Sequence, residues 1–240
     1  MLLEVEGVSK RFGGLTAVSE VSFAVSEGQV VGLIGPNGAG KTTLFNLIAG
    51  ALRPSAGVIR FAGLDISGQK PYKICRHGLC RTFQIVKPFG NLSVIDNVVI
   101  GAFTRVRDRR EAYEAAETIV EATGLARWRD SITHALPIGV RKRVEVARSL
   151  ATQPRMILLD EVMNGLNPTE LREMMDLIQR LNSGGLTILL IEHVMAAVMS
   201  LCQRIVVVHH GEKIADAAPE AVARDPRVIE AYLGEEYLIQ

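Results

Sequence analysis

The sequence predicts an α/β fold built on a mainly parallel sheet, and three observations lead to this prediction. Apolar blocks alternate with helical stretches in the second half of the chain, at residues 156–160, 186–192 and 204–210. Strands that are continuously apolar and separated by helices are typical of a parallel sheet covered on both faces. Other strand-like runs open the chain, and its 240 residues fit one domain with a sizeable core.

The expected elements follow in chain order. Strand-like runs cover residues 2–8, 17–25, 29–35 and 58–63, and a helix over 41–49 ends at Gly50. From about Tyr72 to Ala151 the pattern is mostly helical, with a clear helix that stops at Gly124, so this stretch is interpreted as an insertion. Further helices are expected around residues 171–181 and 197–203, and one or two short ones in the tail after Ala218.

The composition gives no reason to expect a membrane-spanning, secreted or nucleic-acid-binding protein. The longest apolar runs are far shorter than the ~20 residues of a membrane-spanning helix, and no secretory signal is visible after Met1. A net charge of +1 gives no reason to expect a nucleic-acid partner. Three cysteines without metal-ligand spacing, Cys75, Cys80 and Cys202, are expected to be reduced thiols of a cytosolic protein.

A glycine-rich loop carries the most specific signal. The segment GPNGAGKTT, residues 35–43, follows an apolar strand, opens a helix and fits G-x-x-x-x-G-K-[ST] at every fixed position. Its glycines let backbone N–H groups wrap around phosphates at a helix N-terminus. Lys41 is expected to bridge the β- and γ-phosphates, and Thr42 to ligate Mg²⁺. The predicted nucleotide contacts of this loop are Gly35, Asn37, Gly38, Ala39, Gly40, Lys41, Thr42 and Thr43.

Two acids and a histidine complete the predicted hydrolytic site. Asp160 ends the apolar strand MILLD, where it is expected to hold Mg²⁺ through water, and Glu161 beside it is expected to polarise the attacking water as a base. His193 follows another apolar strand and so lies at the same sheet edge, where a neutral imidazole can contact the γ-phosphate. A surface acid pair and a structural histidine are the alternatives.

Together these motifs resemble an ATP-binding-cassette (ABC) ATPase over the whole chain. The resemblance implies a P-loop NTPase core, an N-terminal antiparallel β subdomain and an inserted helical subdomain. It assigns residues 1–84 and 152–215 to the core with the β subdomain, 85–151 to the helical subdomain and 216–240 to a C-terminal helical tail. It also implies that Phe12 stacks on adenine, with a core position as the alternative, and that Gln84 senses the metal and contributes to catalysis.

Four segments narrow the resemblance to the ATPase subunits of branched-chain amino-acid importers: RTFQIVKPFGNLSVIDNV, GLNPTE, LIEHVM and PEAVARDPRVIEAYLGEEY. That subfamily implies ATP and Mg²⁺ as cofactors, separate membrane permease subunits, a second ATPase subunit and, indirectly, a solute-binding protein. The permease is expected to dock in a groove near Val86–Val94, which places the chain peripherally at the cytoplasmic membrane face. The transported solute would be a branched-chain amino acid or a related small organic molecule.

The segment LPIGV, residues 136–140, stands where the family has L-S-G-G-Q, a motif that contacts the γ-phosphate bound by a second subunit. Leu136 and Gly139 match, whereas Pro137, Ile138 and Val140 replace polar or glycine positions. Contacts in trans by Leu136, Ile138, Gly139 and Val140 therefore depend on backbone N–H groups and the helix dipole. One lost hydrogen bond to a charged group, ~1.5–3 kcal/mol, would weaken ATP-driven dimerisation roughly ten- to a hundred-fold.

Two interpretations of LPIGV stay open: a working contact made by the backbone alone, which we favour, and a weak motif compensated by a heterodimeric partner. Two other functions compete with transport. A non-transport ABC ATPase acting on nucleic acid or ribosomes usually has two cassettes in one chain or a long coiled-coil or metal-binding insertion, and this sequence shows neither. A P-loop kinase would not need Gln84, LPIGV and His193.

Overall fold

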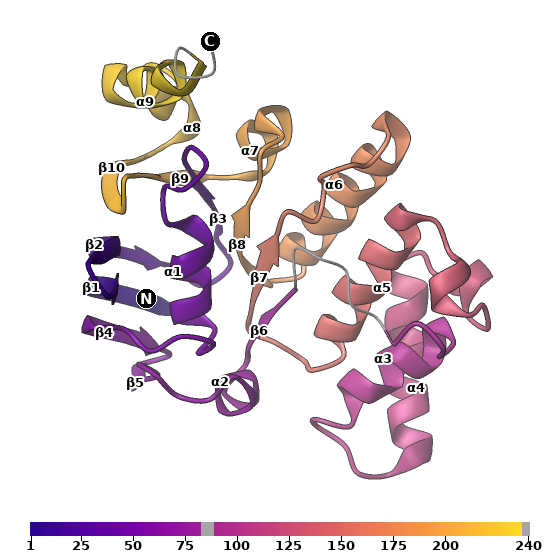
Figure 1. Cartoon of the computed structure of the whole chain (residues 1–240). Helices are drawn as coiled ribbons and strands as arrows, with labels where there is room; N and C mark the ends of the chain where they lie inside the picture. Colours follow the sequence, from indigo (N-terminus) through magenta and orange to yellow (C-terminus); the bar gives the residue numbers. More distant parts are fainter. Residues whose placement is uncertain (83–88, 237–240) are drawn as a thin grey trace.

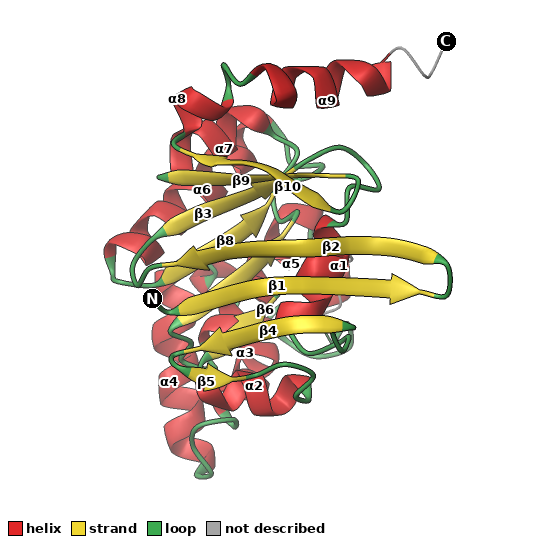
Figure 2. Cartoon of the chain, turned by 90° about the vertical axis from the view of Figure 1, so that its left-hand side faces the viewer, coloured by secondary structure: helices red, strands yellow, loops and turns green. Residues whose placement is uncertain are grey.

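The computed structural model describes residues 1–82 and 89–236, and it contains two sheets with a helix between them (Figures 1 and 2). The first sheet is antiparallel, has the order β2-β1-β4-β5, and contains β1 (Leu3–Phe12), β2 (Leu15–Val25), β4 (Ala56–Phe61) and β5 (Leu64–Asp65). The predicted α/β class and the N-terminal antiparallel sheet are confirmed.

The second sheet has the order β10-β9-β3-β8-β7-β6, and its strands are parallel except for the antiparallel pair β9 and β10. The strands are β3 (Val30–Ile34), β6 (Leu79–Arg81), β7 (Met156–Asp160), β8 (Thr187–Ile191), β9 (Arg204–His209) and β10 (Glu212–Ala217). Every residue of β3, β7 and β8 is buried, as continuously apolar strands require. The short strands β5, β6 and β10 were not predicted.

Helix α1 (Lys41–Ile48) lies between the two sheets (Figure 1). Its apolar residues, including Phe45, share one core with side chains of both sheets. A second core covers the other face of the parallel sheet and involves α6 (Pro168–Ser183), α7 (Met195–Leu201) and α8 (Pro219–Val222). Helix α9 (Pro226–Glu236) follows at the end of the described chain.

Three helices form a third core on the β6–β7 side of the parallel sheet (Figure 1). They are α3 (Val94–Ala102), α4 (Arg109–Ala122) and α5 (Ile138–Leu150), with 3₁₀ turns at Ala126–Trp128 and Thr133–Ala135; α2 (Pro71–His77) precedes β6. One face of α5, with Val144 and Ala147, lies in the helical core. Val146 of α5 belongs instead to the core against the parallel sheet, so this helix connects the two units.

None of the described helices is long and apolar enough to cross a membrane.

Helix α6 begins with a capping box that predicts a measurable stability effect. The Asn167 side chain accepts hydrogen bonds from the N–H groups of Thr169 and Glu170, and the Glu170 carboxylate accepts one from Asn167 N–H. We expect Asn167→Ala to lower the free energy of unfolding by about 1 kcal/mol in urea denaturation. Asn167→Asp keeps the cap and should lie within a few tenths of a kcal/mol of the wild type; an Asp variant as unstable as the Ala variant would contradict the capping role.

Candidate functional site

The predicted motifs meet at the carboxyl edge of the parallel sheet. Parallel pairing of β3 with β8 and of β7 with β8 brings the carboxyl ends of these three strands to one edge. Residues 37–43, Ala17, Glu161 and His193 line one cavity of ≈ 250 Å³ there. The structure thus brings the glycine loop, the second acid and the histidine together, which their order in the sequence does not guarantee.

The glycine loop needs its glycines at defined positions. Gly35 has φ +152°, and a Cβ atom there would lie 2.0 Å from the carbonyl oxygen of Val208. Gly40 has φ +102°, and its Cβ would lie 2.5 Å from the carbonyl oxygen of Ala17. Gly38, at φ +75°, faces open space. The loop therefore passes against β9 and β2 with no room for side chains at two of its three glycines. It leads directly into the N-terminus of α1, where the first N–H groups have no partners inside the helix.

The Lys41 ammonium group is buried inside this loop. Its Nζ donates hydrogen bonds to the carbonyl oxygens of Gly35, at 2.6 Å, and Pro36, at 2.7 Å. Both acceptors are neutral carbonyl oxygens of the loop itself, so these two contacts hold the lysine beside the cavity without a carboxylate. Lys41 also lines the cavity, so its positive charge lies where an entering anion would bind.

The Asp160 carboxylate forms a buried ion pair that the sequence did not predict. Its Oδ2 accepts a hydrogen bond from Arg81 Nη2 at 2.7 Å, while Arg81 Nη1 donates to Asn46 of α1 at 2.6 Å. The backbone N–H of Asp160 donates to the Thr82 hydroxyl. The other oxygen, Oδ1, is buried and has no hydrogen-bond partner among the described residues. A buried, unpartnered carboxylate oxygen is a fitting ligand for a hard cation or its water.

Glu161 lies directly after β7 in a left-handed backbone conformation, φ +51°. This conformation is uncommon for a residue with a side chain. Its Oε1 lies 2.9 Å from Nε2 of His193, and because an ionised carboxylate can only accept, Nε2–H donates. Glu161 is buried while His193 is exposed, so the pair stands at the wall of the cavity.

Two further buried charges hold the loop of residues 161–164, here called the Glu161 loop. Lys142 of α5 donates from Nζ to the carbonyl oxygens of Glu161, at 2.9 Å, and Asn164, at 2.5 Å. Glu192, the residue after β8, accepts a hydrogen bond on Oε1 from the N–H of Met163 at 2.8 Å. Burial raises the pKa of Glu192 to about 7 and lowers the pKa of Lys142, and the attraction between the two charges opposes both shifts.

Phe12 ends β1 and is 45% exposed, so it is not a core residue. Its ring lies outside the residues that line the cavity, and Lys10 Nζ stands 5.1 Å from the ring centroid. An exposed aromatic face of this kind is available for stacking.

The LPIGV segment forms the start of α5. Pro137 precedes the helix, and the carbonyl of Pro137 accepts from Arg141 N–H, which leaves the N–H groups of Ile138, Gly139 and Val140 without partners inside the helix. Val140 is buried in the helical core, together with Leu136. A Cβ at Gly139 would lie 2.6 Å from a Glu170 oxygen, so Gly139 allows α6 to approach. The backbone groups remain as the polar part of the motif.

Gln84 lies outside the described residues, as do residues 86–88 of the predicted docking stretch Val86–Val94. The described part of that stretch is held in shape by Asn97, whose side chain bonds both the N–H and the carbonyl of Phe89. Phe89 is 49% exposed, and the Arg148 guanidinium lies 5.5 Å from its ring centroid.

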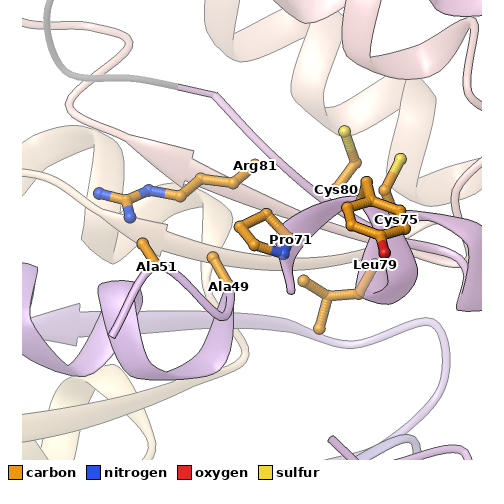
Figure 3. Close-up of a pocket in the computed structure, with 8 residues that line it drawn as sticks. Ala49, Ala51, Pro71, Cys75, Leu79, Cys80 and Arg81 are labelled. Carbon is orange, nitrogen blue, oxygen red and sulfur yellow. The ribbon is translucent and has the colours of Figure 1, made fainter. Parts of the chain in front are cut away.

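A mostly apolar cavity of ≈ 320 Å³ lies between α1, α2 and β6 (Figure 3). Pro71, Tyr72 and Cys75 of α2 line it on one side, and Arg81 points across it toward α1, away from the two cysteines that Figure 3 labels. Because Arg81 also holds Asp160, the cavity lies next to the site's buried acid.

Sequence reasoning missed Arg81, Lys142 and Glu192. Glu192 carried a usable signal, since it is an acid at the carboxyl end of an apolar strand, as Asp160 is. Arg81 is the last residue of a three-residue strand that is too short for a pattern. Lys142 lies on the second buried face of α5, in a run of basic residues that gives no sign of burial.

The geometry of the glycine loop predicts different losses of stability when Gly35 and Gly38 are each replaced by alanine. We expect Gly35→Ala to destabilise the chain by roughly 3 kcal/mol, because its Cβ meets a backbone carbonyl that cannot move aside. Gly38→Ala is the matched control: it has only the left-handed backbone strain of about 1 kcal/mol. Urea unfolding measures both, and equal losses would contradict the close approach of the loop to β9.

The raised pKa of Glu192 predicts a pH-dependent stability difference. A carboxyl whose pKa is higher in the folded state favours folding at low pH, and that contribution is lost as pH rises toward about 7. The stability of the wild type relative to Glu192→Gln should therefore fall by about 2 kcal/mol between pH 5.5 and 8. Urea unfolding at several pH values measures this difference; a constant difference would mean that Glu192 titrates normally.

Comparison with known proteins agrees with this geometry. The family described as "ABC transporter" matches residues 18–164, and "Branched-chain amino acid ATP-binding cassette transporter" matches residues 212–237. The chain is 41% identical to the high-affinity branched-chain amino acid transport ATP-binding protein BraF of Pseudomonas aeruginosa and 40% identical to LivG of Escherichia coli, over 98% of each chain. A crystal structure of an ABC transporter ATP-binding cassette in its ADP conformation is 32% identical, with a TM-score of 0.87 over 97% of this chain and 98% of that one. The chain belongs to the ABC transporter family as one of its ATP-binding cassettes.

Proposed function

We propose that the chain is the ATP-hydrolysing subunit of an importer for branched-chain amino acids or a related small organic solute. The observation that carries this proposal is the single cavity shared by the glycine loop, Glu161 and His193. The solute class follows from the names of its relatives, which are 40–41% identical over nearly the whole chain. No feature described here favours action on nucleic acid or ribosomes.

ATP is proposed to bind with its phosphates in the glycine loop. The backbone N–H groups of residues 37–43 and the Lys41 ammonium supply positive charge, and Thr42 and Thr43 supply hydroxyls at the start of α1. The exposed ring of Phe12 is proposed to stack on adenine. The domain division given above, with a core, a helical subdomain and a tail, is part of the same proposal.

Mg²⁺ is proposed to be held by the Thr42 hydroxyl, by Gln84 and, through water, by Asp160. The unpartnered, buried Oδ1 of Asp160 supports this assignment. When bound, the cation neutralises charge on the phosphate oxygens. Arg81 holds Asp160 Oδ2 in place with a hydrogen bond, which leaves Oδ1 to bind the water that contacts the cation.

Hydrolysis is proposed to use Glu161 as the base. Its carboxylate accepts a proton from the water that attacks the γ-phosphorus, the bond to the β-phosphate oxygen breaks, and ADP is the leaving group. His193 Nε2–H holds the carboxylate in place and stands at the cavity wall where it can approach the γ-phosphate. Burial of Glu161 keeps its negative charge from being screened by solvent.

A second ATPase subunit is proposed to complete the site. The free N–H groups of Ile138, Gly139 and Val140 are proposed to contact the γ-phosphate bound by that subunit, through the backbone alone. Membrane permease subunits are proposed to dock near Val86–Val94. The exposed Phe89 ring supports a short helix as the docked segment. These partners would hold the chain at the cytoplasmic face of the membrane, with a solute-binding protein acting indirectly.

Removing the proposed base tests the hydrolytic role. Glu161→Gln should leave ATP affinity within about threefold and slow hydrolysis at least roughly 100-fold, since general base catalysis contributes that much. Equilibrium binding of ATP and steady-state phosphate release measure the two effects. Asp176→Asn, which removes an exposed carboxylate from α6, serves as control and should leave both unchanged. Turnover that persists in Glu161→Gln would exclude Glu161 as the base.

A further inference from the structure

The Glu161 loop is clamped from both sides by side chains that the hydrolytic reaction itself does not require. Lys142 Nζ bonds the carbonyl oxygens at both ends of the loop, Glu161 and Asn164. Glu192 Oε1 bonds the N–H of Met163 between them. Lys142 is 6% exposed and Glu192 is 1% exposed, so water cannot replace either contact at low cost.

The clamp consists of opposite charges that attract each other. The charged groups that act on Glu192 are Lys142, which favours its ionised form, and Glu161, which opposes it; backbone N–H groups of Met163 and His193 also face it. Lys142 is in turn attracted by Glu192, Glu161 and Glu145. Both side chains also bond the backbone of one short loop, which makes them one functional unit.

The clamp also fixes a strained residue. Glu161 has φ +51°, a conformation that persists only where neighbouring contacts enforce it. The bond from Lys142 to the Glu161 carbonyl acts on this same residue, and the bond between Glu161 Oε1 and His193 Nε2 depends on the direction the backbone gives to the side chain. A shift of about 1 Å in a reacting group can lower a rate roughly 100-fold.

Lys142 belongs to α5, whose first residues are LPIGV. We propose that Lys142 and Glu192 are positioning residues, which set the Glu161 carboxylate for hydrolysis and connect its position to helix α5. This inference rests on the proposed hydrolytic function. It assigns to α5 two roles at once: its N-terminus faces a second subunit, and its second turn holds the base of the chain's own site.

Steady-state ATP hydrolysis by variants of the full chain, alone and mixed with a partner ATPase subunit, tests the proposal. Glu192→Ala removes the acceptor for Met163 N–H, and Lys142→Met removes both carbonyl contacts. Each should lower kcat at least tenfold while KM for ATP stays within about twofold. Glu192→Gln keeps an acceptor oxygen in the same place and should retain kcat within about threefold of the wild type.

The control is Asp176→Asn, which alters an exposed carboxylate of α6 outside the clamp. Its kcat should equal that of the wild type. The double variant Lys142→Met/Glu192→Ala should have about the same kcat as the more impaired of the two single variants, because both side chains act through one loop.

Three results would overturn the proposal: wild-type kcat in folded Glu192→Ala or in Lys142→Met, parallel changes in kcat and KM, or a Gln variant as impaired as the Ala variant. If Glu192→Ala does not fold, Lys142→Met alone decides between these outcomes. Failure of this inference is distinct from failure of the proposed function. In the first case Glu161→Gln is inactive while the clamp variants are active; in the second, Glu161→Gln hydrolyses ATP as the wild type does.

Discussion

Parallel hydrogen bonding between β3, β8 and β7 is the constraint on which the site depends. It aligns Val30 to Gly32 with Ile188 to Leu190, and Met156 to Asp160 with Thr187 to Ile191, so all three strands end at one edge. A parallel sheet of buried strands needs helices on both faces, and α1 on one face and α6 and α7 on the other supply them. The catalytic geometry is therefore a consequence of how the core is built.

Around this edge the chain buries several charged side chains, and polar contacts or opposite charges act on Asp160, Glu192 and Lys142. Arg81 offsets Asp160, while Glu192 and Lys142 offset each other across the Glu161 loop. Breaking such a buried pair costs more than the pair contributes, so these groups specify one arrangement of the loops. Polar contacts position the Glu161 loop and the proposed base at the cavity, whereas apolar packing holds the two sheets and α1 together.

The residues proposed to bind nucleotide and catalyse hydrolysis could be predicted from the sequence, but the buried charged residues that position them could not. The glycine loop was recognisable from its motif. Asp160, Glu161 and His193 were recognisable because they stand at or just after the ends of apolar strands, and such ends converge at one edge of a parallel sheet. Arg81 and Lys142 were not recognisable, since burial of a cation depends on which face of a short strand or of a doubly covered helix meets the core. Antiparallel β10 was missed for a related reason: as an edge strand of mixed polarity, it lacks the apolar run that marks β7 or β8.

The central claim, that LPIGV completes a nucleotide site through its backbone, is tested most directly by ATP hydrolysis of the purified chain as a function of its concentration. The free N–H groups at the start of α5 predict a rate per subunit that rises with protein concentration, as self-association assembles the site. A negligible rate at every concentration, restored only by a different ATPase subunit, would contradict it and would make the heterodimer the working unit.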